Sequence, residues 1–335
     1  MIKIGIIGTG AWATTLGILL ARTGNQTTLW SRTKARASEL SNARVNKRSV
    51  PGVDFPDSMM VSNSFDESLG NAEVIIVAVP SVTIRENMRK IRNAIPSSAY
   101  VLCATKGIEI ACGKRMSQVI TEELTNFSSD QIGVLSGPNL APEIAAGNVA
   151  TATVAFPNEA IAEKVQAILS SDLFRVYRSE DVTGVELGGA LKNIIAIGAA
   201  FIDGAGLGSN AKAAYVTRGL HEITRLGVAM GAKPDTFAGL SGMGDLLTTC
   251  YSNLSRNYRL GLGLASGRDL SSVLKDLGQI AEGVPTTQAA VRLAQKLGVE
   301  MPIADATYAV LFEGASPNDA IKDLMRRTLQ PEVRY

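Results

Sequence analysis

The sequence is poor in the residues on which several enzyme classes depend. It has one histidine, His221, and three cysteines, Cys103, Cys112 and Cys250, none of them in a C-x-x-C pair. A metal centre built from histidine and cysteine, or a nucleophile activated by histidine, has almost no material to use, and we expect no metal site. Because three cysteines cannot all pair in disulfides, we expect a reducing, cytoplasmic location.

Long apolar segments and a strong net charge are also absent. The longest uninterrupted run of apolar residues and glycine, 194–202, covers nine residues, whereas a membrane-spanning helix needs about 20. The net charge is only +2, and basic residues are not interleaved with the few aromatic ones (5%), which argues against nucleic acid as a partner. With 46% hydrophobic residues, we expect a globular protein with no stable membrane insertion and no secretory signal.

The pattern of the chain changes near residue 180. Before it, short apolar runs alternate with helix-length segments, which predicts parallel strands joined by helical crossovers. These strands are expected at residues 3–8, 26–30, 74–79, 100–104, 132–135, 151–156 and 174–177. After it, no strand-like run appears. Helices are expected there at residues 182–202, 211–230, 254–265, 286–297 and 302–313. The sequence therefore predicts a mostly parallel α/β domain over 1–180 and an all-α domain over 181–335, packed tightly without a flexible linker.

The first expected strand ends in a glycine-rich turn that is typical of dinucleotide binding. The segment Gly8-Thr9-Gly10-Ala11-Trp12-Ala13 fits G-x-G-x-x-G/A and opens a helical pattern. Gly8 permits a tight turn, Gly10 lets a pyrophosphate approach the backbone, and Ala13 keeps the helix close to the strand. This context predicts a Rossmann-type domain. The alternative is an ordinary glycine-rich turn between a strand and a helix.

The first 50 residues carry many basic side chains and a single acid, Glu39. The basic residues are Lys3, Arg22, Arg32, Lys34, Arg36, Arg44, Lys47 and Arg48. A bound anion explains this excess, and so does a solvated basic face. Arg32 follows the second strand, where an NAD site usually has an acid for the ribose 2′-hydroxyl, and a guanidinium there suits a 2′-phosphate. We expect NADP(H) to be preferred, with NAD(H) also possible if Arg32 only stacks on adenine.

One lysine lies inside an apolar helix. Residues 185–202 are apolar almost all round, which predicts burial, and Lys192 has Gly188 and Gly189 one turn before it. Such small neighbours leave space for a ligand or for another backbone. Burial lowers the pKa of a lysine, which suits a proton donor or acceptor. A structural lysine that extends its ammonium to the surface fits the same pattern.

Two later segments combine polar side chains with turns. Asp245 follows the glycine-containing stretch 240–244, and Ser255, Arg256 and Asn257 lie near an expected helix start. A hydroxyl, a guanidinium and an amide in this setting suit a phosphate group. Taken singly, Asp245 and Ser255 also fit helix caps, and Arg256 fits a surface charge.

Over almost its whole length the chain resembles the bacterial-type NAD(P)-dependent glycerol-3-phosphate dehydrogenases. The resemblance rests on Gly8–Trp12, Ala104–Gly107, Ser136–Asn139, Glu186–Asn193, Ser241–Asp245, Ser255–Asn257 and Glu282–Gly283. It implies an enzyme that reversibly reduces dihydroxyacetone phosphate to sn-glycerol 3-phosphate and so feeds glycerophospholipid synthesis. The apolar faces of the expected helical domain further suggest a homodimer.

The resemblance also implies roles for single residues. The dinucleotide would be lined by Gly8, Gly10, Ala11, Trp12, Arg32, Lys106, Ala141, Arg256, Ile280 and Glu282. The substrate would be lined by Lys106, Gly137, Asn139, Lys192, Asp245, Ser255, Arg256 and Asn257. Lys192 would accept the proton in the oxidation direction and donate it in reduction, with Lys106 and Asp245 as further catalytic residues. Ala11 and Asn139 depart from the family pattern, which often has Ser at the first position and Ser or Thr at the second.

Two other functions fit parts of the pattern. A different two-domain β-hydroxyacid or ketoacid reductase would share the glycine loop and a lysine in the helical domain. It would have no need of residues 255–257 as a phosphate grip, so activity on an unphosphorylated ketone would favour it. A regulatory module that senses a dinucleotide would bind it without turnover and would leave Lys192 and Asp245 unexplained.

Overall fold

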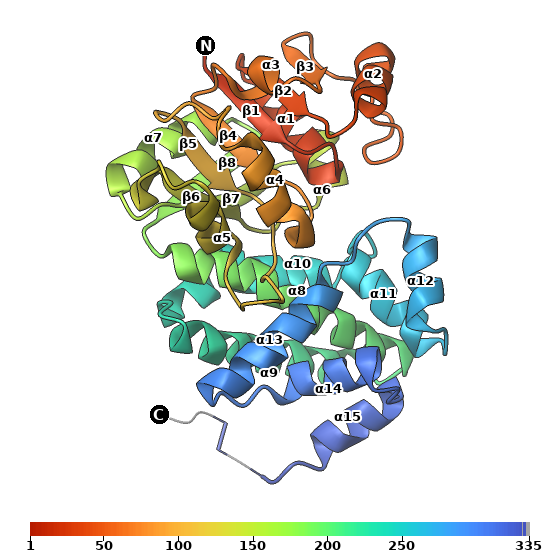
Figure 1. Cartoon of the computed structure of the whole chain (residues 1–335). Coiled ribbons are helices and arrows are strands. Elements are labelled where there is room, and N and C mark those ends of the chain that lie inside the picture. The colour runs from red at the N-terminus through yellow and green to blue at the C-terminus, as the bar shows by residue number, and fades with distance from the viewer. Residues whose placement is uncertain (330, 333–335) are drawn as a thin grey trace.

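The chain folds into a sheet-based part followed by a helical part, as seen in the computed structural model, which describes residues 1–329 and 331–332 (Figure 1). Eight strands form one sheet in the order β3-β2-β1-β4-β5-β6-β7-β8. The strands are β1 (Lys3–Ile7), β2 (Gln26–Trp30), β3 (Met59–Ser62), β4 (Val74–Val77), β5 (Tyr100–Cys103), β6 (Ile132–Ser136), β7 (Ala150–Ala155) and β8 (Phe174–Ser179). The first six follow the strand order of a Rossmann fold, which confirms the expected fold class.

Neighbouring strands of this sheet are parallel except β6 and β7, which pair antiparallel. The seven strands expected from the sequence are present, each ending within two residues of its expected position. Strand β3 was not expected. It has only four residues, of which Val61 alone is β-branched, and it pairs with β2 only. Such a short edge strand carries little periodic signal.

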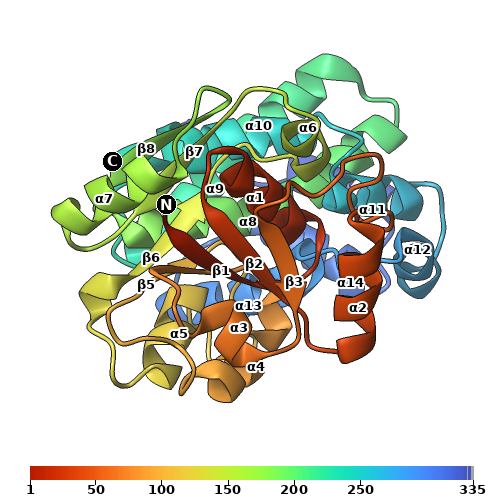
Figure 2. The same ribbon diagram turned by 90° about the horizontal axis from the view of Figure 1, so that it is seen from above.

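Helices cover both faces of the sheet (Figure 2). They are α1 (Ala11–Arg22), α2 (Lys34–Ala43), α3 (Phe65–Leu69), α4 (Ile84–Ile91), α5 (Met116–Glu123), α6 (Ala141–Ala145) and α7 (Glu159–Leu169). Apolar residues of α1, α2, α6 and α7 share one core cluster, and those of α3, α4 and α5 share another. This double cover explains why all four residues of β4, VIIV, are apolar and buried.

The helical part is built around α8 (Val182–Gly204), which is buried from Gly184 to Ile202. The further helices are α9 (Gly208–Ala229), α10 (Asp245–Cys250), α11 (Arg256–Ala265), α12 (Leu270–Leu277), α13 (Gly283–Leu297), α14 (Pro302–Phe312) and α15 (Pro317–Met325). The five expected helices are confirmed, whereas α10, α12 and α15 are too short to show a clear helical period. Helix α8 is long and apolar enough to cross a membrane, but that stretch is entirely buried inside the protein, so it is a core helix.

The two parts exchange apolar side chains. Ile108, in the loop after β5, belongs to the buried cluster of the helical part together with Leu187 and Leu191. Conversely, Val185 of α8 belongs to a cluster of the sheet part that includes Ile84 and Met116. The junction is therefore made of packed side chains rather than a flexible linker.

Candidate active site

The turn after β1 can be formed only with glycine. Gly8 has φ +123°, and a Cβ there would lie 2.6 Å from the carbonyl oxygen of Ala78. Gly10 is the N-cap of α1, and a Cβ on it would meet no atom within 4 Å. The helix N-terminus therefore faces open space, as an anionic ligand requires. The buried Ala13 keeps α1 against the sheet.

Asn46, which sequence reasoning did not single out, holds this turn in place. It is fully buried, and its Nδ2 donates to the Thr9 carbonyl oxygen at 3.0 Å and to Thr14 Oγ1 at 2.8 Å. Its Oδ1 accepts from Arg36 Nη2 at 2.7 Å and from the Ser49 N–H at 3.3 Å. A single asparagine in a polar loop has no periodic signal, so only the structure reveals this link.

Three of the arginines near the N-terminus make contacts within the protein, and a fourth, Arg32, has no ion-pair partner among residues 1–329. Arg22 donates to the Ala145 carbonyl oxygen, and Arg44 donates to three carbonyl oxygens of the segment 55–59, so these two are structural. Arg36 pairs with Glu39 and supports Asn46. Arg32 is exposed directly after β2, and within residues 1–329 it has no ion-pair partner. A bound anion is therefore expected near Arg32 and not along the whole basic segment.

Two lysines share one buried carboxylate. Lys192 of α8 is only 6% exposed, and its Nζ donates to Asp245 Oδ1 and to Thr249 Oγ1. Lys106 follows β5, and its Nζ lies 2.5 Å from Asp245 Oδ2 and 3.1 Å from the Gly137 carbonyl oxygen. The structure thus brings all three expected catalytic residues together. The alternative of a lysine that reaches the surface is wrong for Lys192.

The environment of Lys192 makes its proton mobile. Burial lowers the pKa of Lys192 to about 8; Asp245 opposes this shift, and the nearby Lys106 adds to it. A lysine with a pKa near 8 can give up and regain a proton near neutral pH, as a general acid requires. The carboxylate of Asp245 compensates for part of the cost of burying the two ammonium groups.

Glycines allow the parts of the site to meet. A Cβ on Gly188 would lie 2.7 Å from the Ser241 carbonyl oxygen, and one on Gly189 would lie 2.2 Å from Ser136 Oγ. The space beside Lys192 is therefore occupied by protein, from the end of β6 and from the π-helical turn η4 (Leu240–Gly244). That turn leads directly into α10 and places Asp245 at its first position.

Thr249 and Asn193 are two residues of the site that the sequence analysis did not identify. Thr249 lies one helical turn after Asp245, and its Oγ1 donates to the Asp245 carbonyl oxygen at 2.6 Å while accepting from Lys192. Asn193 follows Lys192, and its Oδ1 accepts from Asn257 Nδ2 at 2.8 Å. The four-residue spacing on α10 is a signal that could have identified Thr249.

The 255–257 triplet begins α11. Ser255 is the N-cap, and its Oγ accepts from the Tyr258 N–H at 3.2 Å, so its interpretation as a cap is confirmed. Asn257 is held on both sides, by Asn193 and by the Gly283 N–H at 2.9 Å. Arg256 is half-buried rather than a fully exposed surface charge, and burial lowers the pKa of its guanidinium. The helix N-terminus and the guanidinium together form a positive end on α11.

Glu282 lies between the sheet and α11. It is the N-cap of α13 and accepts from the Ser81 N–H at 3.1 Å and from Ser81 Oγ at 2.5 Å. Burial raises the pKa of Glu282, whereas hydrogen bonds from Ser81 and the charge of Arg256 lower it. Ile280, two residues earlier, is 40% exposed. Both expected dinucleotide residues thus lie on the segment that leads into α13.

The loop after β6 completes the site. Gly137 has φ +151°, and a Cβ there would lie 2.9 Å from Ala152 Cα. Asn139 Nδ2 donates to the Thr151 carbonyl oxygen at 3.0 Å, and its buried Oδ1 has no partner within the described chain. Ala141 begins α6, and its carbonyl oxygen accepts from Thr15 of α1 at 3.1 Å. The segment 137–141 is therefore fixed against both β7 and α1.

The site segments that come from the sheet part all follow the carboxyl ends of parallel strands. Gly8 follows β1, Arg32 follows β2, Ser81 follows β4, Lys106 follows β5 and Gly137 follows β6. The carboxyl ends of parallel strands meet at one edge of a sheet, which is where ligands bind in open α/β folds. The helical part lies against this edge (Figure 1). The arrangement can hold an extended anion along the edge and protonate a group beside Lys192.

Comparisons with known proteins cover both parts of the chain. The family described as NAD-dependent glycerol-3-phosphate dehydrogenase N-terminus matches residues 3–162, and its C-terminal counterpart matches residues 181–322. A Citrifermentans bemidjiense protein named Glycerol-3-phosphate dehydrogenase [NAD(P)+] is 44% identical over 98% of both chains. A Bacillus cytotoxicus protein with the same name is 44% identical over 99% of this chain and 98% of its own.

Solved structures agree with these sequence matches. The glycerol-3-phosphate dehydrogenase of Coxiella burnetii superposes with a TM-score of 0.92 at 36% identity, covering 97% of this chain and 99% of its own. D-mandelate dehydrogenase and a ketopantoate reductase reach TM-scores of 0.64 and 0.61 at only 15% and 16% identity, and so share the fold alone. The chain therefore belongs to the family of NAD(P)+-dependent glycerol-3-phosphate dehydrogenases.

Proposed function

We propose how this glycerol-3-phosphate dehydrogenase uses its residues to reduce dihydroxyacetone phosphate to sn-glycerol 3-phosphate. The observation that carries the proposal is the buried Asp245 shared by Lys106 and Lys192 at the carboxyl edge of the sheet. Such a centre supplies a proton and two positive charges to a ketone oxygen while hydride arrives at the adjacent carbon. The bound nicotinamide dinucleotide supplies that hydride.

The glycine turn fits a dinucleotide. The open space around Gly10 at the start of α1 leaves room for a pyrophosphate against backbone N–H groups. Trp12 Nε1 is buried and has no partner within the described chain, so a donor remains available beside this turn. Residues proposed to hold the rest of the dinucleotide are Ala11, Arg32, Lys106, Ala141, Arg256, Ile280 and Glu282.

Arg32 is proposed to set the preference for NADP(H). Its guanidinium is exposed at the end of β2 and free of an ion pair within residues 1–329, so it can pair with a 2′-phosphate in bidentate fashion. NAD(H) lacks that phosphate and would lose only this contact. Binding of NAD(H) is therefore expected to be weaker but not abolished.

Lys192 is proposed to donate the proton during reduction and to accept it during oxidation. Negative charge grows on the ketone oxygen as hydride transfers to carbon, and the ammonium of Lys192 neutralises it. Lys106, which bonds the same carboxylate, would add a second positive charge to the oxygen. Asp245 keeps the two lysines together, and Thr249 fixes the Nζ of Lys192.

The start of α11 is proposed to bind the substrate phosphate. Ser255 begins the helix, and Arg256 brings a guanidinium to the same end. Asn257 is held by Asn193 and Gly283, so its amide is already oriented. Gly137 and Asn139 would line the substrate from the sheet side. An unphosphorylated ketone would forgo the charge-assisted contacts at this end.

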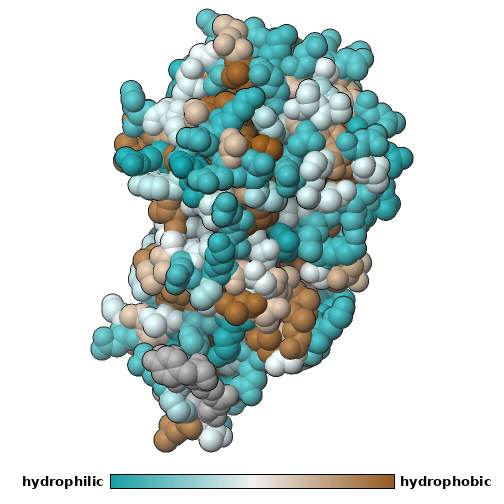
Figure 3. Space-filling model, turned by 90° about the vertical axis from the view of Figure 1, so that its left-hand side faces the viewer, coloured by the Kyte–Doolittle hydropathy of each residue, from teal (hydrophilic) through white to brown (hydrophobic). Residues whose placement is uncertain are grey.

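We propose that residues 1–180 form the dinucleotide domain, that residues 181–335 form the catalytic domain, and that the protein is cytoplasmic. A homodimer is supported by large apolar side chains exposed on the helical part, among them Met243, Leu247 and Tyr251 at four-residue spacing. Figure 3 shows apolar patches that interrupt the polar surface of one face. Sedimentation of the purified protein tests this feature.

The proposed function is tested by following NADPH absorbance with two ketones in parallel. Rapid oxidation of NADPH with dihydroxyacetone phosphate, and little with dihydroxyacetone, supports the phosphate subsite. Comparable rates with both ketones would instead favour a reductase of another β-hydroxyacid or ketoacid. Tight NADPH binding with no turnover of either would indicate a dinucleotide sensor.

A further inference from the structure

Glu186 is a buried carboxylate that the proposed chemistry does not use. It lies on α8, six residues before Lys192, and its side chain is only 2% exposed. Its Oε1 accepts from the Ser117 N–H at 2.8 Å, and its Oε2 accepts from Ser117 Oγ and from Arg115 Nη1, each at 2.6 Å. Burying a carboxylate costs free energy, and these three bonds offset that cost. They also hold Arg115 and Ser117 against the start of α8.

These partners belong to the sheet part, not to the helical part. Ser117 is the second residue of α5, and Arg115 is its N-cap. The carboxylate of Glu186 therefore caps a helix of the other part of the chain, where the helix dipole favours a negative charge. The bonds of Glu186 to Arg115 and Ser117 therefore attach the beginning of α8 to the sheet part.

Arg115 also belongs to a small hairpin that carries Lys106 at its base. Its backbone forms an antiparallel bridge with Ile108, two residues after Lys106. Ile108 is itself inserted into the apolar cluster of the helical part. Glu186 is thus connected to Lys106 in two steps. It bonds Arg115, and Arg115 pairs with Ile108, which lies two residues after Lys106.

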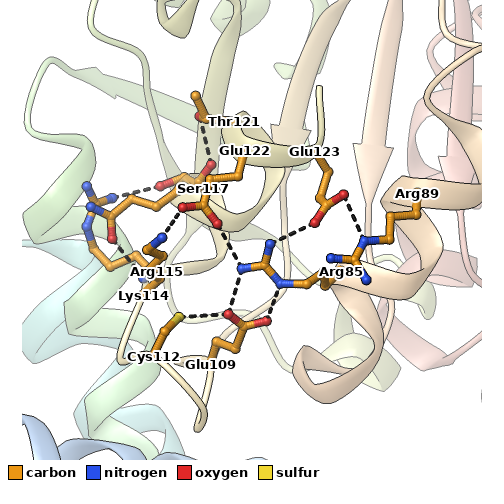
Figure 4. A network of polar contacts seen from close by, with 11 residues as sticks. Arg85, Arg89, Glu109, Cys112, Lys114, Arg115, Ser117, Thr121, Glu122 and Glu123 are labelled. Carbon is orange, nitrogen blue, oxygen red and sulfur yellow. Dashed lines mark hydrogen bonds and ion pairs between the residues drawn. The ribbon is translucent and has the colours of Figure 1, made fainter. Parts of the chain in front are cut away.

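The other side of the hairpin is clamped by Arg85 (Figure 4). Arg85 of α4 donates through Nε and Nη2 to both oxygens of Glu109, at 2.8 and 2.7 Å. It also bonds Glu122 and Glu123 of α5 at 2.9 and 2.7 Å. The hairpin is therefore held at Glu109 by the sheet part and at Arg115 by α8.

We propose that Glu186 is a positioning residue that sets Lys106 and Lys192 at the spacing at which both reach Asp245. One carboxylate is attached rigidly to Lys192 through α8 and to Lys106 through Arg115 and the hairpin. When this tie is lost, α8 and the hairpin can shift relative to each other. Displacement of a reacting group by about 1 Å can lower the rate of chemistry ~100-fold. This inference rests on the roles proposed above for Lys106 and Lys192.

The test is Glu186→Gln, which keeps the volume of the side chain and one acceptor for the Ser117 N–H but removes the charge that holds Arg115. We expect kcat with dihydroxyacetone phosphate to fall ~10- to 100-fold, since the two lysines no longer reach the substrate oxygen together. The dissociation constant for NADPH, measured by its fluorescence, should change by less than about threefold, since the Gly8 turn and Arg32 are untouched. The primary deuterium isotope effect on kcat should be at least as large as in the wild type, because slower hydride transfer then controls more of the turnover.

Glu222→Gln is the matched control. Glu222 is also a buried glutamate and accepts from the N–H groups of Ile303 and Ala304, each at 2.8 Å, but both partners lie within the helical part. Its variant should lose thermal stability and keep kcat. If Glu186→Gln loses no more kcat than this control, or if its isotope effect falls below the wild-type value, Glu186 has only a structural role.

A double-mutant cycle tests the route through Arg115. If Glu186 acts through Arg115, Glu186→Gln should cost little further kcat in an Arg115→Met background, whereas additive losses would overturn the proposal. Should Glu186→Gln fail to fold, Arg115→Met alone removes the link to the hairpin while Glu186 keeps both bonds from Ser117, and a fall in kcat of ~3-fold or more with unchanged NADPH affinity is expected. Unchanged kcat in that variant would overturn the proposal.

Lys192→Met, assayed alongside, separates this proposal from the proposed function. If Lys192→Met keeps its turnover, the role of Lys192 fails and Glu186 has nothing to position. If Lys192→Met is inactive and Glu186→Gln behaves like the Glu222→Gln control, only the role of Glu186 fails.

Discussion

Replacing Lys192 by Met removes the proposed proton donor and little else. The thioether chain has similar length and volume, so α8 should stay packed, since volume-conserving changes usually cost under about 1.5 kcal/mol. Asp245 loses one of its two ammonium partners but keeps Lys106 at 2.5 Å. The buried carboxylate is therefore not left unpaired, and the melting temperature should stay close to that of the wild type.

The Lys192→Met variant should lose activity because it loses the proposed proton donor. A methionine side chain at this position has no ammonium to donate to Asp245 and Thr249 or to protonate the substrate oxygen, so general acid catalysis by Lys192 disappears. That term contributes ~10²- to 10⁴-fold, which corresponds to about 3–5 kcal/mol of transition-state stabilisation. We expect kcat for NADPH oxidation with dihydroxyacetone phosphate to fall by at least the lower factor. The dissociation constant for NADPH, measured by fluorescence titration, should be nearly unchanged.

The pH dependence of the wild-type enzyme should report the same group. Reduction requires the protonated ammonium, so its rate should decline as pH rises past the value of about 8 to which burial lowers the pKa of Lys192. Oxidation requires the neutral amine, so its rate should increase as pH rises through the same value. Turnover of Lys192→Met within about threefold of wild type, or a wild-type alkaline limb that the variant retains, would refute the reasoning. Asp245 or Lys106 would then have to be tested as the donor.

Three further predictions concern ligand binding. Arg32→Asp should weaken NADPH ~10- to 150-fold and NADH far less, because a lost charge-assisted contact costs about 1.5–3 kcal/mol; an unchanged ratio of the two dissociation constants would remove Arg32 from the site. Arg256→Ala should raise the KM for dihydroxyacetone phosphate at least ~10-fold, and unchanged KM values for both ligands would contradict its proposed role. Asn46→Ala should raise the KM for NADPH several-fold by releasing Thr9, while Asn25→Ala, a buried asparagine that bonds Ile2 and Thr23 instead, should leave that KM alone.

The parts of the fold that could be predicted are those with a repeated pattern. Strand β4 was found because both of its faces are buried, and α8 because it is apolar all round. The edge strand β3 was missed because pairing with β2, rather than its own residues, decides its conformation. The antiparallel pairing of β6 and β7 was not expected, because direction depends on how the chain returns to the sheet.

The candidate site divides in the same way. Lys192 and Asp245 stand out because a charged residue inside an apolar helix, or after a glycine turn, breaks a pattern. Asn46 and Glu186 do not stand out, since their importance comes from partners that lie far away in the sequence. The basic charge of Arg44 also gave a wrong indication of ligand binding, because its guanidinium donates to three carbonyl oxygens of the segment 55–59, a contact that only the fold reveals.

The central place of α8 has a consequence for the order in which the enzyme can be made. Its residues are covered from one side by β6 and β7 and from the other by α9, α11 and α13, the last of which ends at Leu297. A chain still emerging from the ribosome therefore has its glycine turn long before it can enclose Lys192. Until α13 has been synthesised, α8 exposes apolar side chains to solvent, and the ammonium of Lys192 is hydrated. Catalytic competence thus arises only when nearly the whole polypeptide is complete.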